Sequence, residues 1–395
     1  MIVKAADVGN FFKKYTMIIA LVVVAILFFF LTNGAILIPQ NINNLIAQNG
    51  YVFVLGTGML LCILTGGNID LSVGSVVCFA GAIGAMMLRA DVSIWLAVLA
   101  MMGTGLVVGS FQGFFIAWKR VPAFIATLAG MYVFRGLSNT VLGGFAVDVN
   151  NATFLKLFGG GADCYVTDFI GPIRLGDLSL NGTCIVLGLV AALGFVGFTL
   201  WRIAVQKKMK IIAKTTGVYV RTSLITAAIL WFTWQLASYK GIPTVLIWVG
   251  LVLGIYTYVT NKTAIGRYLY AIGGNEKATA LSGVSTRKVF FFAYANIGLL
   301  AGLAGALNIA RFVGAQPTYG QGYEMDAIAA CFIGGASAYG GTGKISGVVI
   351  GATLMGLINQ GMTLINLSVN YQPVVKGIVL LLAVMFDVLS KRENH

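Results

Sequence analysis

The sequence predicts an all-α, polytopic membrane protein with about 10–12 transmembrane helices, including broken or re-entrant elements. Of its 395 residues, 58% are hydrophobic and only 10% are charged, which is too little polar surface to cover a water-soluble domain. Apolar runs recur along the whole chain, and its 26 Lys and Arg are divided unevenly among the segments between them. We interpret residues 1–395 as a single transmembrane domain.

Twelve apolar runs are candidates for spans. A spanning helix needs about 20 mainly apolar residues, or somewhat fewer when neighbours bury its ends. The runs cover residues 15–37, 51–64, 71–88, 94–117, 123–142, 183–200, 222–237, 244–260, 289–309, 326–339, 345–362 and 373–389. The first run follows a basic start, as in a signal peptide. Because it is long and no small-residue cleavage site follows it, we interpret it as an uncleaved span.

The basic residues predict the orientation. If the N-terminus is cytoplasmic, nineteen Lys and Arg fall in inner segments and five in outer ones, with the largest inner groups in 201–221 and 261–288. This bias places both termini in the cytoplasm. The net charge of +14 is therefore a topology signal, and we expect no nucleic-acid partner. Arg135 and Lys376 lie within runs, near enough to the ends to reach the membrane interface.

Several kinds of chemistry are excluded. The single histidine is the last residue, His395, so neither a His-ligated metal nor a His general base can be built. The segment 340–344 fails the phosphate-loop pattern, because Ala338 replaces its first glycine and Ile345 its final hydroxyl. The sequence contains no nucleophile–base pair that would indicate a membrane-embedded enzyme. We expect no catalytic residue, metal or cofactor, and any ATP must be hydrolysed by a partner.

The five cysteines give a weak signal. Three lie in apolar runs and are most simply core residues. Cys164 and Cys184 fall on the predicted outer side, where a disulfide between them is possible, but only their placement argues for one.

Two runs are too short to span comfortably, and a glycine-rich stretch follows each. Run 51–64 precedes Thr-Gly-Gly-Asn-Ile-Asp, and run 326–339 precedes Gly-Gly-Thr-Gly. Irregular backbone at membrane depth is tolerated only where protein or a water-filled path covers it. We therefore predict that both are broken or re-entrant elements beside a pathway. Each element carries one carboxylate, Asp70 in the first and Asp326 in the second, and this correspondence suggests a weak internal repeat.

Polar residues near these breaks are candidates for lining the pathway. Sugars are bound by amides and carboxylates beneath aromatic rings, and Tyr319 and Tyr323 flank such groups. The alternatives are an outer loop with helix-capping acids and, for the two amides of run 345–362, hydrogen bonds between helices. The candidates are Asn68, Asp70, Ser72, Glu324, Asp326, Asn359 and Gln360.

The inner loop 261–288 contains a short helix candidate from Asn275 to Ser282. Glu276 lies in its first turn, and Gly283 is a C-terminal stop. A short helix of this kind between two spans is suited to docking in a partner's groove. The expected docking residues are Asn275, Glu276, Lys277, Ala278 and Gly283.

Several long motifs in the sequence resemble those of a known protein family. TGGNIDLSVGS (65–75), VPAFIATLAGM (121–131), GRYLYAIGGNEKATALSGV (266–284) and YEMDAIAACFIGGASAYGGTGKISG (323–347) resemble permease subunits of bacterial ABC importers for monosaccharides. NQGM (359–362) and YQPVVKGIVLLLAV (371–384) extend the likeness to the C-terminus. The extra pair of spans around 183–237 is most similar to the D-xylose or multiple-monosaccharide type.

The resemblance implies a type II-like ABC importer permease in the bacterial inner membrane. Its partners would be membrane lipid, a second copy in a homodimer, two ABC ATPase domains and an extracytoplasmic sugar-binding protein. The solute would be D-xylose or a related pentose or hexose. Asn275 to Gly283 match the family's coupling segment; Asp70, Ser72 and Gly74 match its IDLSVG element, and Asp326 its ELDAIAA element, written EMDAIAA here.

Two other functions stay open on sequence alone. A secondary transporter driven by H⁺ or Na⁺ would need a buried titrating or ion-coordinating group, and Asp70 and Asp326 qualify. The lack of a usable histidine and the coupling loop argue against it. The same superfamily also serves nucleosides and branched-chain amino acids, so an ABC permease for a non-sugar solute is the second alternative.

Overall fold

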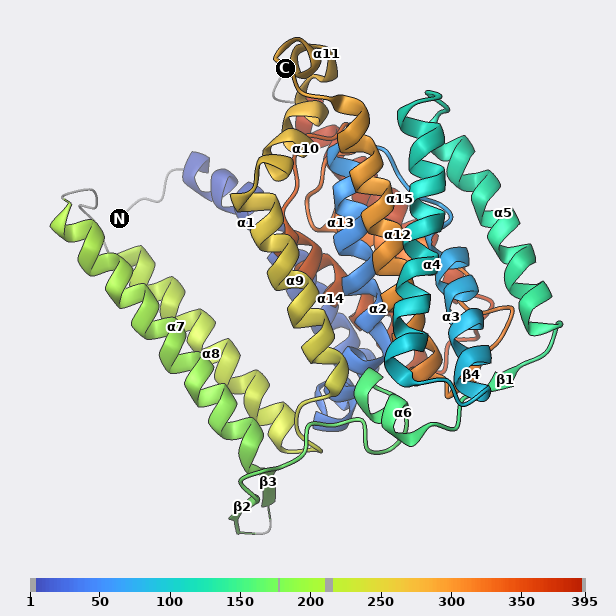
Figure 1. Cartoon of the computed structure of the whole chain (residues 1–395). Helices are drawn as coiled ribbons and strands as arrows, with labels where there is room; N and C mark the ends of the chain where they lie inside the picture. The colour runs from blue at the N-terminus through green and yellow to red at the C-terminus, as the bar shows by residue number, and fades with distance from the viewer. Residues whose placement is uncertain (1–4, 177, 210–215, 393–395) are drawn as a thin grey trace. The chain divides into compact units, whose positions relative to one another are not determined.

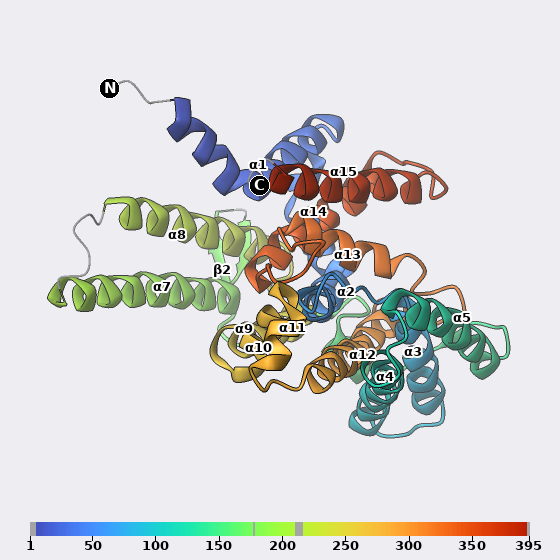
Figure 2. The same ribbon diagram turned by 90° about the horizontal axis from the view of Figure 1, so that it is seen from above.

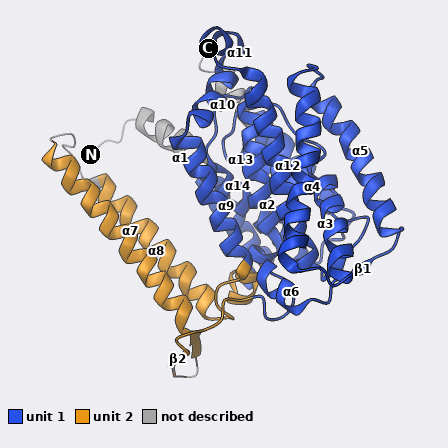
Figure 3. Ribbon diagram, in the orientation of Figure 1, with its two compact units in different colours: residues 1–36, 45–164, 245–395 blue, residues 37–44, 165–244 orange. Residues whose placement is uncertain are grey.

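The structure is a computed structural model that describes residues 5–176, 178–209 and 216–392. It is mostly helical with a few short strands, which confirms the predicted fold class. The chain forms two compact units (Figure 3). The first comprises residues 1–36, 45–164 and 245–395, and the second comprises 37–44 and 165–244.

Each of the twelve apolar runs contains a helix, although the bounds of several helices differ from those of the runs (Figure 1). They are α1 (Ala5–Leu31), α2 (Pro39–Leu64), α3 (Val73–Arg89), α4 (Ile94–Ala117), α5 (Ala123–Leu142), α7 (Gly182–Lys208), α8 (Thr216–Ala237), α9 (Thr244–Lys262), α12 (Thr286–Arg311), α13 (Tyr323–Ile333), α14 (Ile345–Leu364) and α15 (Gln372–Arg392). Shorter elements connect them: η1 (Ala35–Leu37), α6 (Ala152–Phe158), α10 (Ala264–Gly274) and α11 (Glu276–Leu281). Among the described residues, α2, α4, α7, α9, α12 and α14 are each long and apolar enough to cross a membrane.

The prediction that run 51–64 is too short to span is wrong. It is the second half of α2, which begins at Pro39 and has 26 residues. The first half carries several amides, so its sequence looks too polar for a membrane helix. Neighbouring helices bury it, and Asn49 donates to its own helix at the Leu45 carbonyl, 2.8 Å away. The irregular backbone at 65–72 does exist.

Helix α2 lies in the middle of the first unit, with α12, α13 and α14 around it (Figure 2). Small residues allow this close packing. A Cβ at Gly56 would lie 2.9 Å from Val348 of α14, and one at Gly58 would lie 3.0 Å from Ile297 of α12. Run 326–339 behaves as predicted, because α13 has only 11 residues and irregular backbone follows it up to α14.

Helices α4 and α12 approach each other most closely at glycines. A Cβ at Gly105 would lie 2.1 Å from the Gly298 carbonyl oxygen, and one at Gly109 would lie 2.3 Å from that of Tyr294. These glycines therefore allow the two helix backbones to pack closely. Gly103 is an exception, since a Cβ there would meet open space.

Two short strands lie at the end of the first unit that is opposite α11. Strand β1 (Val147–Asp148) pairs antiparallel with β4 (Gly314–Ala315), with Val147 opposite Ala315. Arg135 of α5 donates to the carbonyls of Pro317 and Tyr319, at 3.3 and 2.7 Å. This cation therefore holds the segment that leads into α13.

The second unit contains the helical hairpin α7–α8 and the β-hairpin of β2 (Pro172–Leu175) and β3 (Leu178–Asn181). Asp168 accepts backbone hydrogen bonds from Gly171, Gly182 and Thr183, which fastens the β-hairpin to the start of α7. The Cys184 thiol lies 3.7 Å from the Thr233 carbonyl, and the described part of the chain holds no disulfide. Residues 210–215 of the basic segment 201–221 lie outside the described residues.

Candidate functional site

Asp70 and Ser72 form a buried polar cluster with Gln112 of α4. The Asp70 carboxylate accepts from the Ser72 amide at 2.8 Å and from its hydroxyl at 2.7 Å, and Gln112 Nε2 lies 2.8 Å from that hydroxyl. All three side chains are buried. Tyr294 of α12 covers the same stretch by donating to the Ile69 carbonyl at 3.4 Å. Protein groups therefore satisfy the irregular backbone that precedes α3.

Glu324 lies where the start of α13 meets the start of α3. A Cβ at Gly74 would be 2.6 Å from a Glu324 carboxylate oxygen and 2.1 Å from the Gly320 carbonyl oxygen. The side chain of Glu324 is half-buried. This contact brings the predicted IDLSVG and EMDAIAA elements together, although 250 positions separate Gly74 from Glu324.

Asp326 is fully buried at the centre of a second cluster. Lys376 of α15 forms an ion pair with it at 2.9 Å, and the Tyr51 hydroxyl of α2 donates to the same oxygen. Tyr51 stacks on Tyr323 with ring centroids 3.7 Å apart, and Asn308 donates to the Tyr323 hydroxyl. The prediction that Lys376 is an interfacial anchor is wrong, because a charge-assisted bond to a buried carboxylate holds its ammonium.

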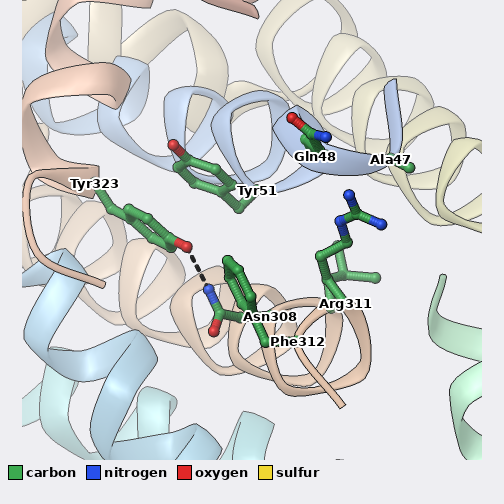
Figure 4. Close-up of a pocket in the computed structure, with 9 residues that line it drawn as sticks. Ala47, Gln48, Tyr51, Asn308, Arg311, Phe312 and Tyr323 are labelled. Carbon is green, nitrogen blue, oxygen red and sulfur yellow. Dashed lines mark hydrogen bonds between the residues drawn. The ribbon is translucent and has the colours of Figure 1, made fainter. Parts of the chain in front are cut away.

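A small cavity lies beside this second cluster (Figure 4). Its volume is about 10 Å³, enough for roughly one water molecule. The residues that line it include Gln48, Tyr51, Asn308 and Arg311. The rings of Tyr51 and Tyr323, which stack on each other, both border this cavity.

Asn359 and Gln360 lie on α14 and face different surroundings. Asn359 Nδ2 donates to Asn49 Oδ1 of α2 at 3.0 Å, so the expected bond between helices is present. The Asn359 Oδ1 and Gln360 Oε1 atoms are buried and accept no hydrogen bond from the described residues. Asn68 is separate from both clusters, because its amide donates to the Thr65 carbonyl at 3.1 Å within the break.

A larger cavity of about 270 Å³ lies between α4 and α5. Phe111, Phe115 and Phe134 line it, and Gln112 is the one polar side chain among its lining residues. Because Gln112 bonds Ser72, the Asp70 cluster lies directly behind this apolar space.

The short helix predicted between Asn275 and Ser282 is confirmed as α11, a capped helix of six residues, and its docking role stays a prediction. The Asn275 side chain accepts from the Ala278 amide at 2.9 Å, and Gly283 has φ +84°, the left-handed conformation that commonly follows a helix. Glu276 forms an exposed ion pair with Arg120 at 2.8 Å. Lys277 and Ala278 are exposed, and Leu281 is 90% exposed.

The structure adds residues that the sequence argument did not select. Gln112, Tyr51 and Asn308 complete the two clusters, and Arg120 joins the α4–α5 loop to α11. The signal for Gln112 and Asn308 was present, since both are amides within apolar runs, as Asn359 is. Tyr51 and Arg120 carry no comparable local signal.

Comparison with known proteins agrees with these motifs. Residues 41–384 match the family model described as the permease component of branched-chain amino acid transport systems. The Haemophilus influenzae xylose transport system permease protein XylH is 34% identical over 96% of this chain and 97% of its own length. The Escherichia coli K12 XylH is 32% identical over 97% and 93%. The ribose import permease protein RbsC of the same strain is 34% identical over 88% and 85%. No solved structure matches the chain.

Proposed function

Because the chain belongs to the family of branched-chain amino acid transport system permease components, we propose that it forms the membrane pathway of an ATP-driven importer for a monosaccharide, with D-xylose as the first candidate. Xylose permeases and a ribose permease are both similar to it over nearly the full length. In this proposal two copies associate in the bacterial inner membrane with two ATPase subunits and an extracytoplasmic sugar-binding protein. The permease itself makes and breaks no covalent bond.

The charge distribution supports the orientation. By sequence, nineteen of the 26 Lys and Arg fall in the segments expected to be cytoplasmic, and five of these lie between residues 261 and 288, around α11. Since basic loops stay in the cytoplasm, α11 then faces the ATPase, and Arg135 and β4 face the sugar-binding protein.

Helix α11 is the observation that carries the proposal. Exposed apolar side chains on short, rigid elements are typical anchors for a partner's pocket. Leu281 is 90% exposed at the last position of α11, while Asn275 caps the first turn and Gly283 stops the helix. The segment therefore presents a preorganised apolar end, with Glu276 and Lys277 beside it, to an ATPase groove.

The pathway residues have a defined role in this proposal. Asp70, Ser72, Glu324 and Asp326 lie where the starts of α3 and α13 meet, and Asn68, Asn359 and Gln360 lie further along the breaks and α14. In this proposal, the stacked tyrosines and the water-sized cavity beside them correspond to the closed state of the pathway. We infer that ATP binding separates these helix starts, since alternating access moves packed elements between discrete arrangements.

A secondary transporter is less well supported. Both candidate carboxylates have structural partners: Asp70 accepts from Ser72, and Asp326 is paired with Lys376 and Tyr51. An ion-coupled carrier would not need an exposed, capped docking helix such as α11.

Uptake in proteoliposomes tests the function. The permease is reconstituted with its ATPase and binding protein, and radiolabelled D-xylose and D-ribose are supplied outside. We expect ATP-dependent accumulation of one pentose, and none when the ATPase subunit is omitted. Failure to accumulate any monosaccharide that the binding protein recognises would contradict the sugar assignment.

Variants of α11 test the coupling role. Leu281→Ser should weaken association with the ATPase at least about tenfold, which corresponds to 1.4 kcal/mol. Leu281→Met preserves apolar volume and is the control. Glu276→Ala combined with Gly283→Ala should uncouple ATP hydrolysis from uptake without preventing membrane insertion. Wild-type uptake by both the Leu281→Ser and the Glu276/Gly283 variants would refute this assignment.

A further inference from the structure

The two glycine-rich breaks are in direct backbone contact. The Gly341 amide donates to the Leu64 carbonyl, the last residue of α2, at 3.1 Å. A Cβ at Gly67 would lie 1.9 Å from the Ala338 carbonyl oxygen, and one at Gly340 would lie 2.4 Å from the Gly66 Cα. Any side chain at these positions would force the two breaks apart.

Helix α10 meets both breaks at the same place. A Cβ at Gly273 would be 2.0 Å from the Leu64 carbonyl oxygen and 2.1 Å from the Gly341 amide nitrogen. Three residues earlier, the Tyr270 hydroxyl donates to the Gly343 carbonyl at 2.8 Å. We call this contact the glycine hub, formed by Gly66, Gly67, Gly273, Gly340 and Gly341.

Helices α10 and α11 are joined without a flexible linker. Asn275 is the single residue between them, and it caps both. Its amide donates to the Ala271 carbonyl of α10 at 2.9 Å, and its side chain accepts from the Ala278 amide of α11 at the same distance. A displacement of α11 must therefore move the end of α10 that carries Gly273 (Figure 1).

Each break continues from the glycine hub to a candidate site. The first runs through residues 65–72 to Asp70 and Ser72 at the start of α3. The second, residues 334–344, joins α13, which carries Glu324 and Asp326, to α14. The hub is thus the point at which the elements leading to both polar clusters touch the docking segment.

We propose that Gly273 and Tyr270 are positioning residues through which movement of α11 sets the positions of both breaks together. The inference rests on the proposed function, since it assumes that an ATPase moves α11. Its physical basis is stiffness: contacts between backbones have no rotatable side chain to absorb a shift, and close-packed protein transmits strain. On this account, coupling requires a glycine at position 273, and the shape of α10 does not.

Paired substitutions test the proposal in the complete reconstituted importer. Gly273→Ala places a methyl group into the glycine hub, whereas Gly274→Ala adds the same group where nothing lies within 4 Å. The readout is the ratio of D-xylose transported to ATP hydrolysed, with ATPase association and thermal stability measured in parallel. We expect Gly273→Ala to lower the ratio about tenfold, within the range usual for coupling between sites. Gly274→Ala should match the wild type.

Tyr270→Phe gives a second, milder test, because it removes only the hydrogen bond to Gly343. We expect about a threefold lower ratio, as for loss of one ordinary hydrogen bond, with ATPase association unchanged. If Gly273→Ala does not assemble, the result for Tyr270→Phe decides. If the Gly273→Ala complex assembles and its transport-to-ATP ratio equals that of the wild type, the proposed role of the glycine hub is refuted. If Gly273→Ala does not assemble, a wild-type ratio in Tyr270→Phe refutes it. Absence of ATP-dependent uptake by the wild type would instead overturn the proposed function, and this inference with it.

Discussion

Two ion pairs of nearly equal length lie in opposite surroundings. Lys376 and Asp326 are 2.9 Å apart, with side chains 18% and 0% exposed. Arg120 and Glu276 are 2.8 Å apart, with side chains 56% and 39% exposed. The first ties α15 to α13 beside the stacked tyrosines, and the second ties the α4–α5 loop to α11.

The comparison shows that distance alone does not determine what an ion pair contributes. Removing one partner of a buried pair leaves an uncompensated charge, whereas an exposed pair can exchange its partner for water at little cost. The buried pair therefore locks α13 to α15, so these two helices should move as one body, whereas α11 is held by an exposed pair that can be broken and remade. This division suits a docking segment that exchanges its surface contacts while α13 and α15 stay joined.

Breaking the buried pair should have the largest effect. Lys376→Met leaves the Asp326 carboxylate without its cation, and we expect a loss of about 3–5 kcal/mol in stability. The measurement is unfolding of the purified permease in detergent. The matched control is Lys376→Met combined with Asp326→Asn, which removes both charges and should recover most of the loss. Equal stability of the single variant and the wild type would contradict the locking of α13 to α15.

Removing one neutral partner should have a smaller effect. Tyr51→Phe keeps the stack on Tyr323 but deletes the hydrogen bond to Asp326, and hydrogen bonds to charged groups contribute about 1.5–3 kcal/mol. Tyr323→Phe deletes the hydrogen bond that Asn308 donates to the Tyr323 hydroxyl. Because both groups are neutral, we expect a stability loss of about 0.5–1.5 kcal/mol. The same unfolding assay should rank Tyr51→Phe as the more damaging. The reverse order would show that the charge of Asp326 does not dominate the cluster.

Breaking the exposed pair should have the smallest effect. Arg120→Ala should cost about 0.2–1 kcal/mol, and the difference from the wild type should shrink at high salt because exposed charges are screened. Exchanging the charges, with Arg120→Glu and Glu276→Arg together, should restore the wild-type value. A salt-independent loss as large as that of Lys376→Met would remove the distinction between the two pairs.

Local signals explain what could be predicted from the sequence. The apolar runs located eleven long helices and the short α13. Asn275 and Gly283 located α11, because capping and left-handed backbone depend on nearby residues. The orientation and the individual pathway roles stay predictions.

The features that could not be predicted depend on long-range packing. The amide-rich start of α2 looks polar, yet it is helical because neighbouring helices bury it. Tyr51 and Asp326 are 275 positions apart, and Lys376 and Asp326 are 50 apart. No sequence window spans these separations, so neither pairing has a local signature. The contact between the two glycine-rich breaks is of the same kind.

The energy source tests the central claim most directly. Proteoliposomes containing the permease, its ATPase and its binding protein are loaded with ATP, and D-xylose uptake is measured with and without ionophores that collapse proton and sodium gradients. An ATP-driven pathway predicts uptake that needs ATP and is unchanged by the ionophores. Uptake that follows an imposed ion gradient without ATP would contradict the account.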